Sequence, residues 1–215
     1  HMKDLPLHIE CFDNSNIQGT NPVASMVCFK NAKPSKKDYR HFHIKTVEGP
    51  DDFASMREVV SRRYSRLVEE GLPLPNLLIV DGGKGQLSSA VEAMKEVGVF
   101  GKIPVIGIAK RLEEIYYPGD SYPLLINKKS ESLKLIQQLR NEAHRFAITF
   151  HRNVRSKNFI KSELKGIKGV GPKSMELLLK TFKSVKRIKE CTTEELINVV
   201  GQDKAVKVWS HFHAE

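Results

Sequence analysis

Two aspartates stand at the ends of apolar runs, and together they could hold a metal ion. Asp81 follows Leu77–Val80 and precedes two glycines, and Asp13 closes the segment that begins at His8. If the two runs are neighbouring parallel strands, both carboxylates lie at one edge of the sheet, where α/β proteins place their sites. Two close carboxylates repel each other by about 1–4 kcal/mol, and a divalent cation removes this repulsion. The pair therefore predicts a Mg²⁺ or Mn²⁺ site for phosphodiester hydrolysis, although either aspartate alone could equally cap the turn that follows it.

Further candidate residues lie outside these two segments. His144 is one position off the apolar stripe of a helix expected to begin after Ser130, and Arg140 lies one turn earlier on the same face. A histidine there can be a metal ligand, a proton carrier or a structural residue at the rim, and His151 is a rival for the same role. Asp52 falls in the expected first turn of another helix, where an acid can serve the site or only the helix dipole.

The glycines after Asp81 indicate a turn at which a ligand can come close to the backbone. The segment Gly82-Gly83-Lys84-Gly85 resembles a phosphate-binding nest, but it lacks the spacing of a nucleotide P-loop. We therefore expect Lys84 to point at a substrate phosphate and do not expect ATP to bind.

A second glycine motif lies near the C-terminus. Gly169-Val170-Gly171 stands between two expected short helices, where it would leave backbone N–H groups available to a DNA phosphate without reading sequence. Lys168 and Lys173 add positive charge. The alternative is an ordinary glycine-containing turn between helices.

The spacing of apolar residues predicts the elements that must position these groups. Alternating and continuous apolar runs indicate strands over 7–13, 22–30, 39–47, 77–81 and 104–109, and a small hairpin within 112–127. Helical spacing indicates helices from about 52, over 86–97 and after Ser130. Two sets of apolar residues should face the core from the first and last of these helices: Phe53, Met56, Val59, Val60, Tyr64 and Leu67, then Leu133, Ile136, Leu139, Ala143, Ala147 and Phe150. The order β-β-β-α-β-α-β-α predicts a mixed sheet with helices packed on it.

The character of the chain changes near Ser156. Residues 157–215 carry 12 Lys and Arg against 7 Asp and Glu and show shorter helical periods. We expect two domains, over 3–155 and 156–215, joined by a polar basic linker around Arg152–Lys157.

Composition narrows the class of protein. The chain has 215 residues, 40% of them hydrophobic, and a net charge of +10, which favours a polyanionic partner, nucleic acid first, over a merely basic surface. His1-Met2 looks like a cloning remnant, so we expect a fragment of a longer protein. No apolar run approaches a membrane span and no signal peptide is present. Cys11 and Cys28 are expected to be core thiols in a reducing cytoplasm.

Several motifs, taken together, resemble one known family. They are the Asp13 strand, Asp51-Asp52-Phe53-Ala54-Ser55-Met56, Arg62-Arg63-Tyr64, Ile79–Leu87, Arg140–Ile148 and His151-Arg152. They resemble the C-terminal half of the UvrC family, the incision subunit of bacterial nucleotide excision repair, and the resemblance spans essentially the whole chain.

The resemblance implies an α/β, RNase H-like mixed sheet flanked by helices, followed by a small all-α tandem helix-hairpin-helix domain. It implies a cytoplasmic, metal-dependent endonuclease that cuts lesion-bearing double-stranded DNA on the 5′ side. In the longer protein, UvrB would be a direct partner and UvrA an indirect one. The family's catalytic set falls on Asp13, Asp81 and His144, with a further acid at Asp52.

One hairpin departs from the family pattern. The second hairpin should lie near Val200–Ala205, but it lacks the Gly-hydrophobic-Gly turn, so we do not expect its amides to bind phosphate.

In the preferred mechanism, Asp13 and Asp81 hold the metal, His144 ligates a second ion or moves a proton, and Lys84 and Arg140 stabilise phosphate charge. A histidine in the set favours Mn²⁺ over Mg²⁺. The rival hypotheses are a non-catalytic DNA-binding scaffold and a junction resolvase on the same fold.

Overall fold

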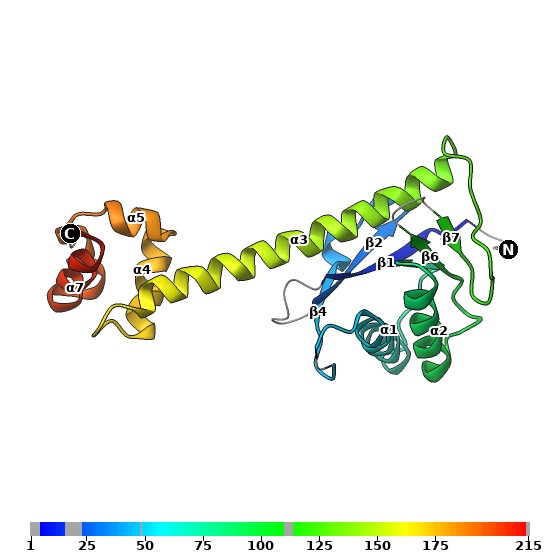
Figure 1. Cartoon of the computed structure of the whole chain (residues 1–215), viewed down its shortest axis with the longest axis horizontal. Helices are drawn as coiled ribbons and strands as arrows, with labels where there is room; N and C mark the ends of the chain where they lie inside the picture. The colour runs from blue at the N-terminus through cyan, green and yellow to red at the C-terminus, as the bar shows by residue number, and fades with distance from the viewer. Residues whose placement is uncertain (1–4, 16–22, 48, 110–113, 214–215) are drawn as a thin grey trace. The chain divides into compact units, whose positions relative to one another are not determined.

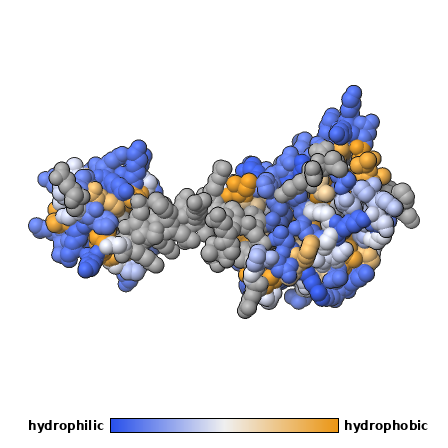
Figure 2. Space-filling model, in the orientation of Figure 1, coloured by the Kyte–Doolittle hydropathy of each residue, from blue (hydrophilic) through white to orange (hydrophobic). Residues whose placement is uncertain are grey.

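The computed structural model describes residues 5–15, 23–47, 49–109 and 114–213, with the backbone alone at residue 15 and over 151–165 (Figure 1). The chain divides into two compact units, His1–Phe150 and His151–Glu215. Hydrophilic residues make up most of the coloured surface in Figure 2, with hydrophobic residues scattered among them. No helix in the described part of the chain is long and apolar enough to cross a membrane.

The first unit is built on the mixed sheet that the sequence predicts. Its described strands are β1 (His8–Ser15), β2 (Val23–Lys30), β3 (Lys33–Pro34), β4 (Arg40–His43), β5 (Leu77–Asp81), β6 (Val105–Ala109) and β7 (Glu114–Tyr116). They lie in the order β3-β2-β1-β5-β6-β7, with β4 also pairing to β2. β1 is antiparallel to β2 and parallel to β5, and β5 is parallel to β6. The predicted parallel neighbourhood of the Asp13 and Asp81 strands is therefore confirmed.

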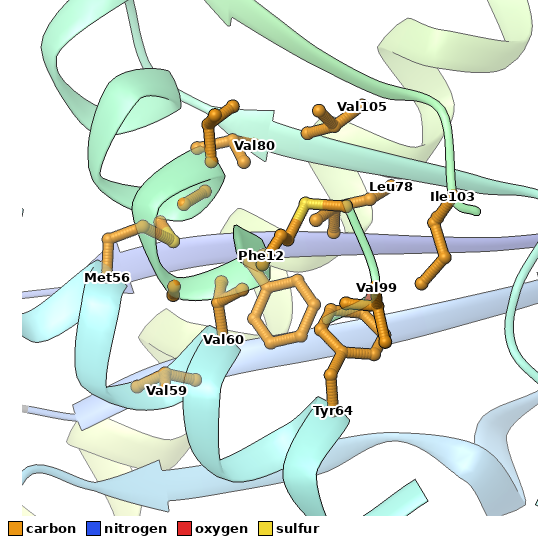
Figure 3. Packing of buried hydrophobic residues seen from close by; sticks show 14 of the residues in the cluster. Phe12, Met56, Val59, Val60, Tyr64, Leu78, Val80, Val99, Ile103 and Val105 are labelled. Carbon is orange, nitrogen blue, oxygen red and sulfur yellow. The ribbon is translucent and has the colours of Figure 1, made fainter. Parts of the chain in front are cut away.

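Helices cover both faces of this sheet. α1 (Asp52–Glu69) and α2 (Lys84–Val97) lie on one face, and the first part of α3 (Glu131–Lys165) lies on the other (Figure 1). Figure 3 shows the core under α1 and α2, in which Phe12 and Tyr64 pack with ring centroids 6.3 Å apart. A second core under α3 contains Cys11, Ile79 and Leu139. Both predicted core thiols, Cys11 and Cys28, are buried.

The helix ends carry the caps that their sequences suggest. The Asp51 carboxylate accepts hydrogen bonds from the backbone N–H groups of Phe53 and Ala54, both at 2.9 Å, which satisfies two of the donors that a helix start leaves open. Ser130 accepts from the Leu133 N–H at 3.2 Å, so the predicted cap of α3 is confirmed.

Several predicted boundaries are wrong. The third strand was expected over 39–47, but β4 ends at His43, which pairs with Val23. The lysine-rich loop before it contains β3 and a short 3₁₀ turn, η1 (Lys36–Asp38). α2 begins at Lys84 rather than at 86. Of the hairpin expected within 112–127, residues 112 and 113 lie outside the described part; β7 pairs with β6, and Ile115 makes one isolated bridge to Leu124.

The polar basic linker expected around Arg152–Lys157 is helical in the structure. The backbone of α3 continues as helix to Lys165 through this stretch. Polarity does not end a helix, whereas glycine does, and the first glycine after Glu131 is Gly166.

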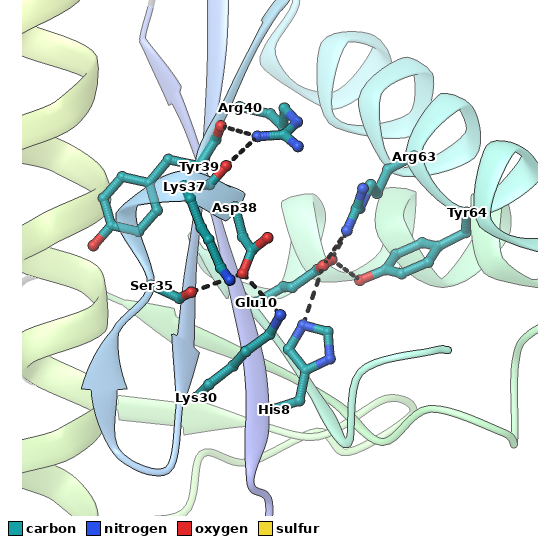
Figure 4. Close-up of polar contacts among 10 residues, drawn as sticks. All are labelled: His8, Glu10, Lys30, Ser35, Lys37, Asp38, Tyr39, Arg40, Arg63 and Tyr64. Carbon is teal, nitrogen blue, oxygen red and sulfur yellow. Dashed lines mark hydrogen bonds and ion pairs between the residues drawn. The ribbon is translucent and has the colours of Figure 1, made fainter. Parts of the chain in front are cut away.

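A buried ion pair holds α1 against β1 (Figure 4). Glu10 of β1 is fully buried, and its carboxylate accepts from Arg63 at 2.6 Å and from the Tyr64 hydroxyl at 3.1 Å. Burial alone raises the pKa of Glu10, but the hydrogen bonds and charges of His8 and Arg63 outweigh it and leave the pKa lowered. Glu10 therefore stays ionised in the core and ties the helix to the strand.

The described secondary-structure elements of the second unit are all helices, as expected. It contains α4 (Pro172–Phe182), α5 (Val185–Glu190), α6 (Thr193–Val200) and α7 (Gln202–His213). Thr192 and Glu195 form a capping box at the start of α6. A separate core includes Leu178, Leu196 and Val208, so this unit buries its own apolar surface.

Candidate metal centre

Three of the predicted site residues lie together at the carboxyl ends of β1 and β5. Ligand atoms of Asp13, Asp81 and His144 all lie within 4.8 Å of one another. Asp13 and Asp81 are 2% and 4% exposed, whereas the His144 side chain is 48% exposed. The His144 Nδ1 atom lies 3.1 Å from Asp13 Oδ2. The structure thus brings the two carboxylates and the imidazole to one point at the sheet edge.

Strand register explains why the two aspartates meet. Cys11 pairs with Ile79 and Phe12 with Val80 across the parallel β1–β5 pair, and the aspartates follow at the next step. Successive side chains alternate between faces, so Asp13 and Asp81 share the face of Cys11 and Ile79, which is the face under α3. A shift of one residue in either strand would turn its carboxylate to the opposite face.

A buried serine fixes α3 over the carboxylates. Ser25 of β2 is directly opposite Asp13 in the antiparallel register, and its hydroxyl donates to the Ala143 carbonyl at 3.0 Å. Ala143 immediately precedes His144, so this bond sets the height of the imidazole above Asp13. On the neighbouring strand, the His41 ring stacks on Phe146 with centroids 3.8 Å apart. Ser25 was not among the predicted site residues, although a small polar residue inside the apolar run of β2 was a signal.

Asp52 lies outside this compact cluster. It is exposed on the first turn of α1, and its backbone carbonyl accepts from Asn14 Nδ2 at 2.6 Å. Asn14 directly follows Asp13 in β1, so Asp52 is tied to the same end of the strand through its backbone. His151, the rival of His144, lies where only the backbone is described.

Arg140 is within electrostatic reach of the cluster. Its guanidinium donates to the Asn141 side chain at 3.1 and 3.2 Å. Burial raises the pKa of the Cys11 thiol, the charges of Asp81 and Asp13 raise it further, and the charge of Arg140 opposes them. The thiol therefore stays neutral near the two carboxylates. The positive charge of Arg140 reaches the same thiol, so Arg140 also lies close enough to act on the carboxylate cluster.

Lys84 makes contacts away from the carboxylates. It begins α2, and its ammonium group donates to the Ser121 carbonyl and lies 5.6 Å from the centre of the Tyr116 ring. Its contact with a substrate phosphate stays a prediction.

The glycine motif of the second unit has the expected turn geometry. Gly169 has a φ of +86°, which favours glycine, and Gly171 is the N-cap of α4 with Pro172 in its first turn. Val170 is buried, and Lys168 and Lys173 are exposed. Any phosphate bound here would therefore meet backbone amides and lysines, not the valine side chain.

The donor set at the sheet edge fits a divalent cation. Two carboxylates and one imidazole are ligands that Mg²⁺, Mn²⁺ and related ions accept in proteins. Both carboxylates are almost fully buried within 4.8 Å of each other, and a cation placed between them would lower their mutual repulsion.

Comparison with known proteins gives matches along nearly the whole chain. Residues 1–148 match the family described as UvrC RNAse H endonuclease domain, and residues 161–212 match the SAM-like Helix-hairpin-helix tandem. UvrABC system protein C of Christiangramia forsetii is 67% identical over 210 residues, which cover 98% of this chain and 35% of that protein. The same protein of Cytophaga hutchinsonii is 64% identical over 205 residues, which cover 95% and 34%. The chain thus spans about a third of the length of these curated relatives.

Among solved structures, the chain is similar to an endonuclease V of Ciona intestinalis in complex with an inosine-containing DNA. The two share 20% sequence identity at a TM-score of 0.36, over 64% of this chain and 56% of that one.

Proposed function

The chain belongs to the UvrC family, and from that premise we propose that its first unit is the metal-dependent nuclease that cuts the damaged DNA strand on the 5′ side of a lesion. The family match over residues 1–148 is to an endonuclease domain. The observation that carries the proposal is the convergence of Asp13, Asp81 and His144 within 4.8 Å at the carboxyl ends of two parallel strands.

The carboxylates of Asp13 and Asp81 would hold Mg²⁺ or Mn²⁺. When bound, the ion would polarise the scissile phosphate and lower the pKa of an attacking water. The carboxylates of both aspartates belong to nearly buried side chains, so their positions are fixed before substrate binds.

His144 would act beside this pair. Its Nδ1 lies 3.1 Å from Asp13 Oδ2, and its side chain is half-exposed, so substrate could approach the ring. Such a ring can ligate a second ion or carry a proton to the leaving group. Arg140 and Lys84 would stabilise phosphate charge, and Asp52 would assist from the start of α1.

The second unit would bind double-stranded DNA through its backbone. The amides of Gly169, Val170 and Gly171 and the charges of Lys168 and Lys173 would hold one or more phosphates without reading sequence. We place the domain boundary at 155/156, within α3. In the longer protein, UvrB would be the direct partner and UvrA an indirect one, all in the cytoplasm.

Nicking of supercoiled plasmid carrying ultraviolet lesions tests the proposal. The chain should nick the plasmid with Mn²⁺ and not with EDTA, and Asp81→Asn should abolish nicking. Asp120→Asn is the matched control, because Asp120 is an exposed aspartate in a surface turn. Nicking by Asp81→Asn at the normal rate would contradict the metal site. No nicking by any form would favour the DNA-binding scaffold, and preference for branched DNA over lesion-bearing duplex would favour the resolvase.

A further inference from the structure

Phe53 does not lie where its spacing predicts. The sequence places it on the buried stripe of α1 with Met56 and Val60, yet it is 55% exposed while those two residues are fully buried. An isolated exposed apolar residue is ordinary on a protein surface, so exposure alone means little. The contacts around the ring of Phe53 are what suggest a function for it.

The start of α1 contacts the segments that follow both carboxylates. Phe53 is next to Asp52, whose carbonyl accepts from Asn14, the residue after Asp13. A Cβ atom added to Gly85 would come within 2.5 Å of the Phe53 ring. Gly85 is in the first turn of α2, four residues after Asp81. The ring therefore packs on the backbone of the Gly85 turn, and the glycine makes room for it.

Phe53 and His144 belong to helices on opposite faces of the sheet. The side chains of Asp13 and Asp81 turn toward α3, which carries His144. Phe53 is on α1, one of the two helices on the other face (Figure 1). A DNA strand that sets a phosphate on the carboxylates would have the imidazole on one side and an exposed aromatic ring on the other.

We propose that Phe53 is a positioning residue that stacks on a nucleobase of the strand being cut, next to the scissile phosphate. This inference rests on the proposed function. Aromatic rings bind bases of single or distorted strands without sequence preference, because every base has a flat face. The contact with Gly85 holds the Phe53 ring in one place, which reduces the entropy that stacking would otherwise cost.

Base fluorescence tests the proposal directly. DNA duplexes carrying 2-aminopurine at successive positions along one strand would be titrated with the chain in an Asp13→Asn background, which keeps the DNA intact. Quenching should appear at one or two adjacent positions, vanish with Phe53→Ala and return with Phe53→Trp. Phe53→Ala should weaken binding of this DNA about 5- to 150-fold, the range for loss of one stacked base.

Two further variants sharpen the result. Gly85→Ala should also reduce the quenching, because the added methyl displaces the ring. Phe100→Ala is the matched control, since Phe100 is 42% exposed at the other end of α2. Thermal unfolding of each variant shows that it is folded, and Phe53→Ala should lose little stability because its ring is half in water.

The outcomes separate the two proposals. Plasmid nicking by the wild-type chain together with quenching that Phe53→Ala leaves unchanged would overturn the role of Phe53 alone. Absence of metal-dependent nicking by the wild-type chain would overturn the proposed function, and the stacking inference with it.

Discussion

Replacing Asp81 with asparagine should make the metal-free protein more stable. Asp13 and Asp81 are nearly buried, and their ligand oxygens lie within 4.8 Å of each other. At an effective dielectric constant of 20, two unit charges at that distance repel by about 3.5 kcal/mol. His144 and Arg140 offset part of this repulsion, so we expect a gain of about 1–3 kcal/mol. Functional sites commonly reduce stability in this way.

Thermal unfolding in EDTA measures the effect. For a chain of this size, 1 kcal/mol moves the unfolding midpoint by about 2–4 °C, so the midpoint of the first unit should rise by roughly 2–12 °C. Asp120→Asn is the control and should change stability by no more than about 0.5 kcal/mol, because Asp120 is exposed.

Addition of Mn²⁺ should reverse the order. At a concentration 1,000 times its dissociation constant, a bound ion stabilises the folded state by about 4.1 kcal/mol, which exceeds the gain expected from Asp81→Asn. The wild-type midpoint should rise with Mn²⁺, and the Asp81→Asn midpoint should not. An Asp81→Asn protein that is less stable than wild type in EDTA, or that gains as much from Mn²⁺, would refute the reasoning.

Four other variants test separate parts of the account. His144→Ala should slow incision about 10²–10⁴-fold with little change in unfolding midpoint, and a normal incision rate would exclude it from the site. Ser25→Ala should lose about 1 kcal/mol on denaturant unfolding and also slow incision, because α3 loses its bond to the sheet; unchanged incision would remove its positioning role. Glu10→Gln should be roughly 3–5 kcal/mol less stable at pH 7. Since the folded-state pKa of Glu10 is lowered, its contribution is complete above the ordinary value of 4.5 and is lost as the pH falls through the lowered value, so the two unfolding curves should converge in acid. Changing both Gly169 and Gly171 to valine should weaken duplex binding. The slope of log affinity against log salt concentration should become shallower by about 0.9 for each phosphate that the variant no longer neutralises. An unchanged slope would show that the turn does not contact DNA.

The sheet and the carboxylate pair could be predicted because both depend on local sequence. The strands of Asp13 and Asp81 are apolar runs with polar ends, and the right-handed crossover allows few arrangements of them. The pairing of β1 with β5 follows, and with it the meeting of the two aspartates.

The errors arise where distant residues decide the outcome. Beyond His43, the alternation of Ile44 and Val47 continues in the sequence, but the pairing of β4 with the described part of β2 ends at His43 and Val23. Phe53 has helical spacing with the core of α1, yet it packs on Gly85 of another helix.

The polar contacts also could not be predicted from sequence. Lys84 contacts Ser121, 37 residues away, and Ser25 reaches Ala143, 118 residues away. The continuation of α3 past residue 150 could have been predicted, because no glycine or proline interrupts it before Gly166.

The central claim is that Asp13 and Asp81 hold a divalent metal ion next to His144, and a crystal of this chain soaked in Mn²⁺ tests it most directly. An anomalous difference map should show a peak between the two carboxylates, with one oxygen of each in direct coordination and the His144 ring beside it. Loss of the peak in Asp81→Asn crystals would complete the result. A wild-type map with no peak at this edge of the sheet, or with its peak on other residues, would contradict the account.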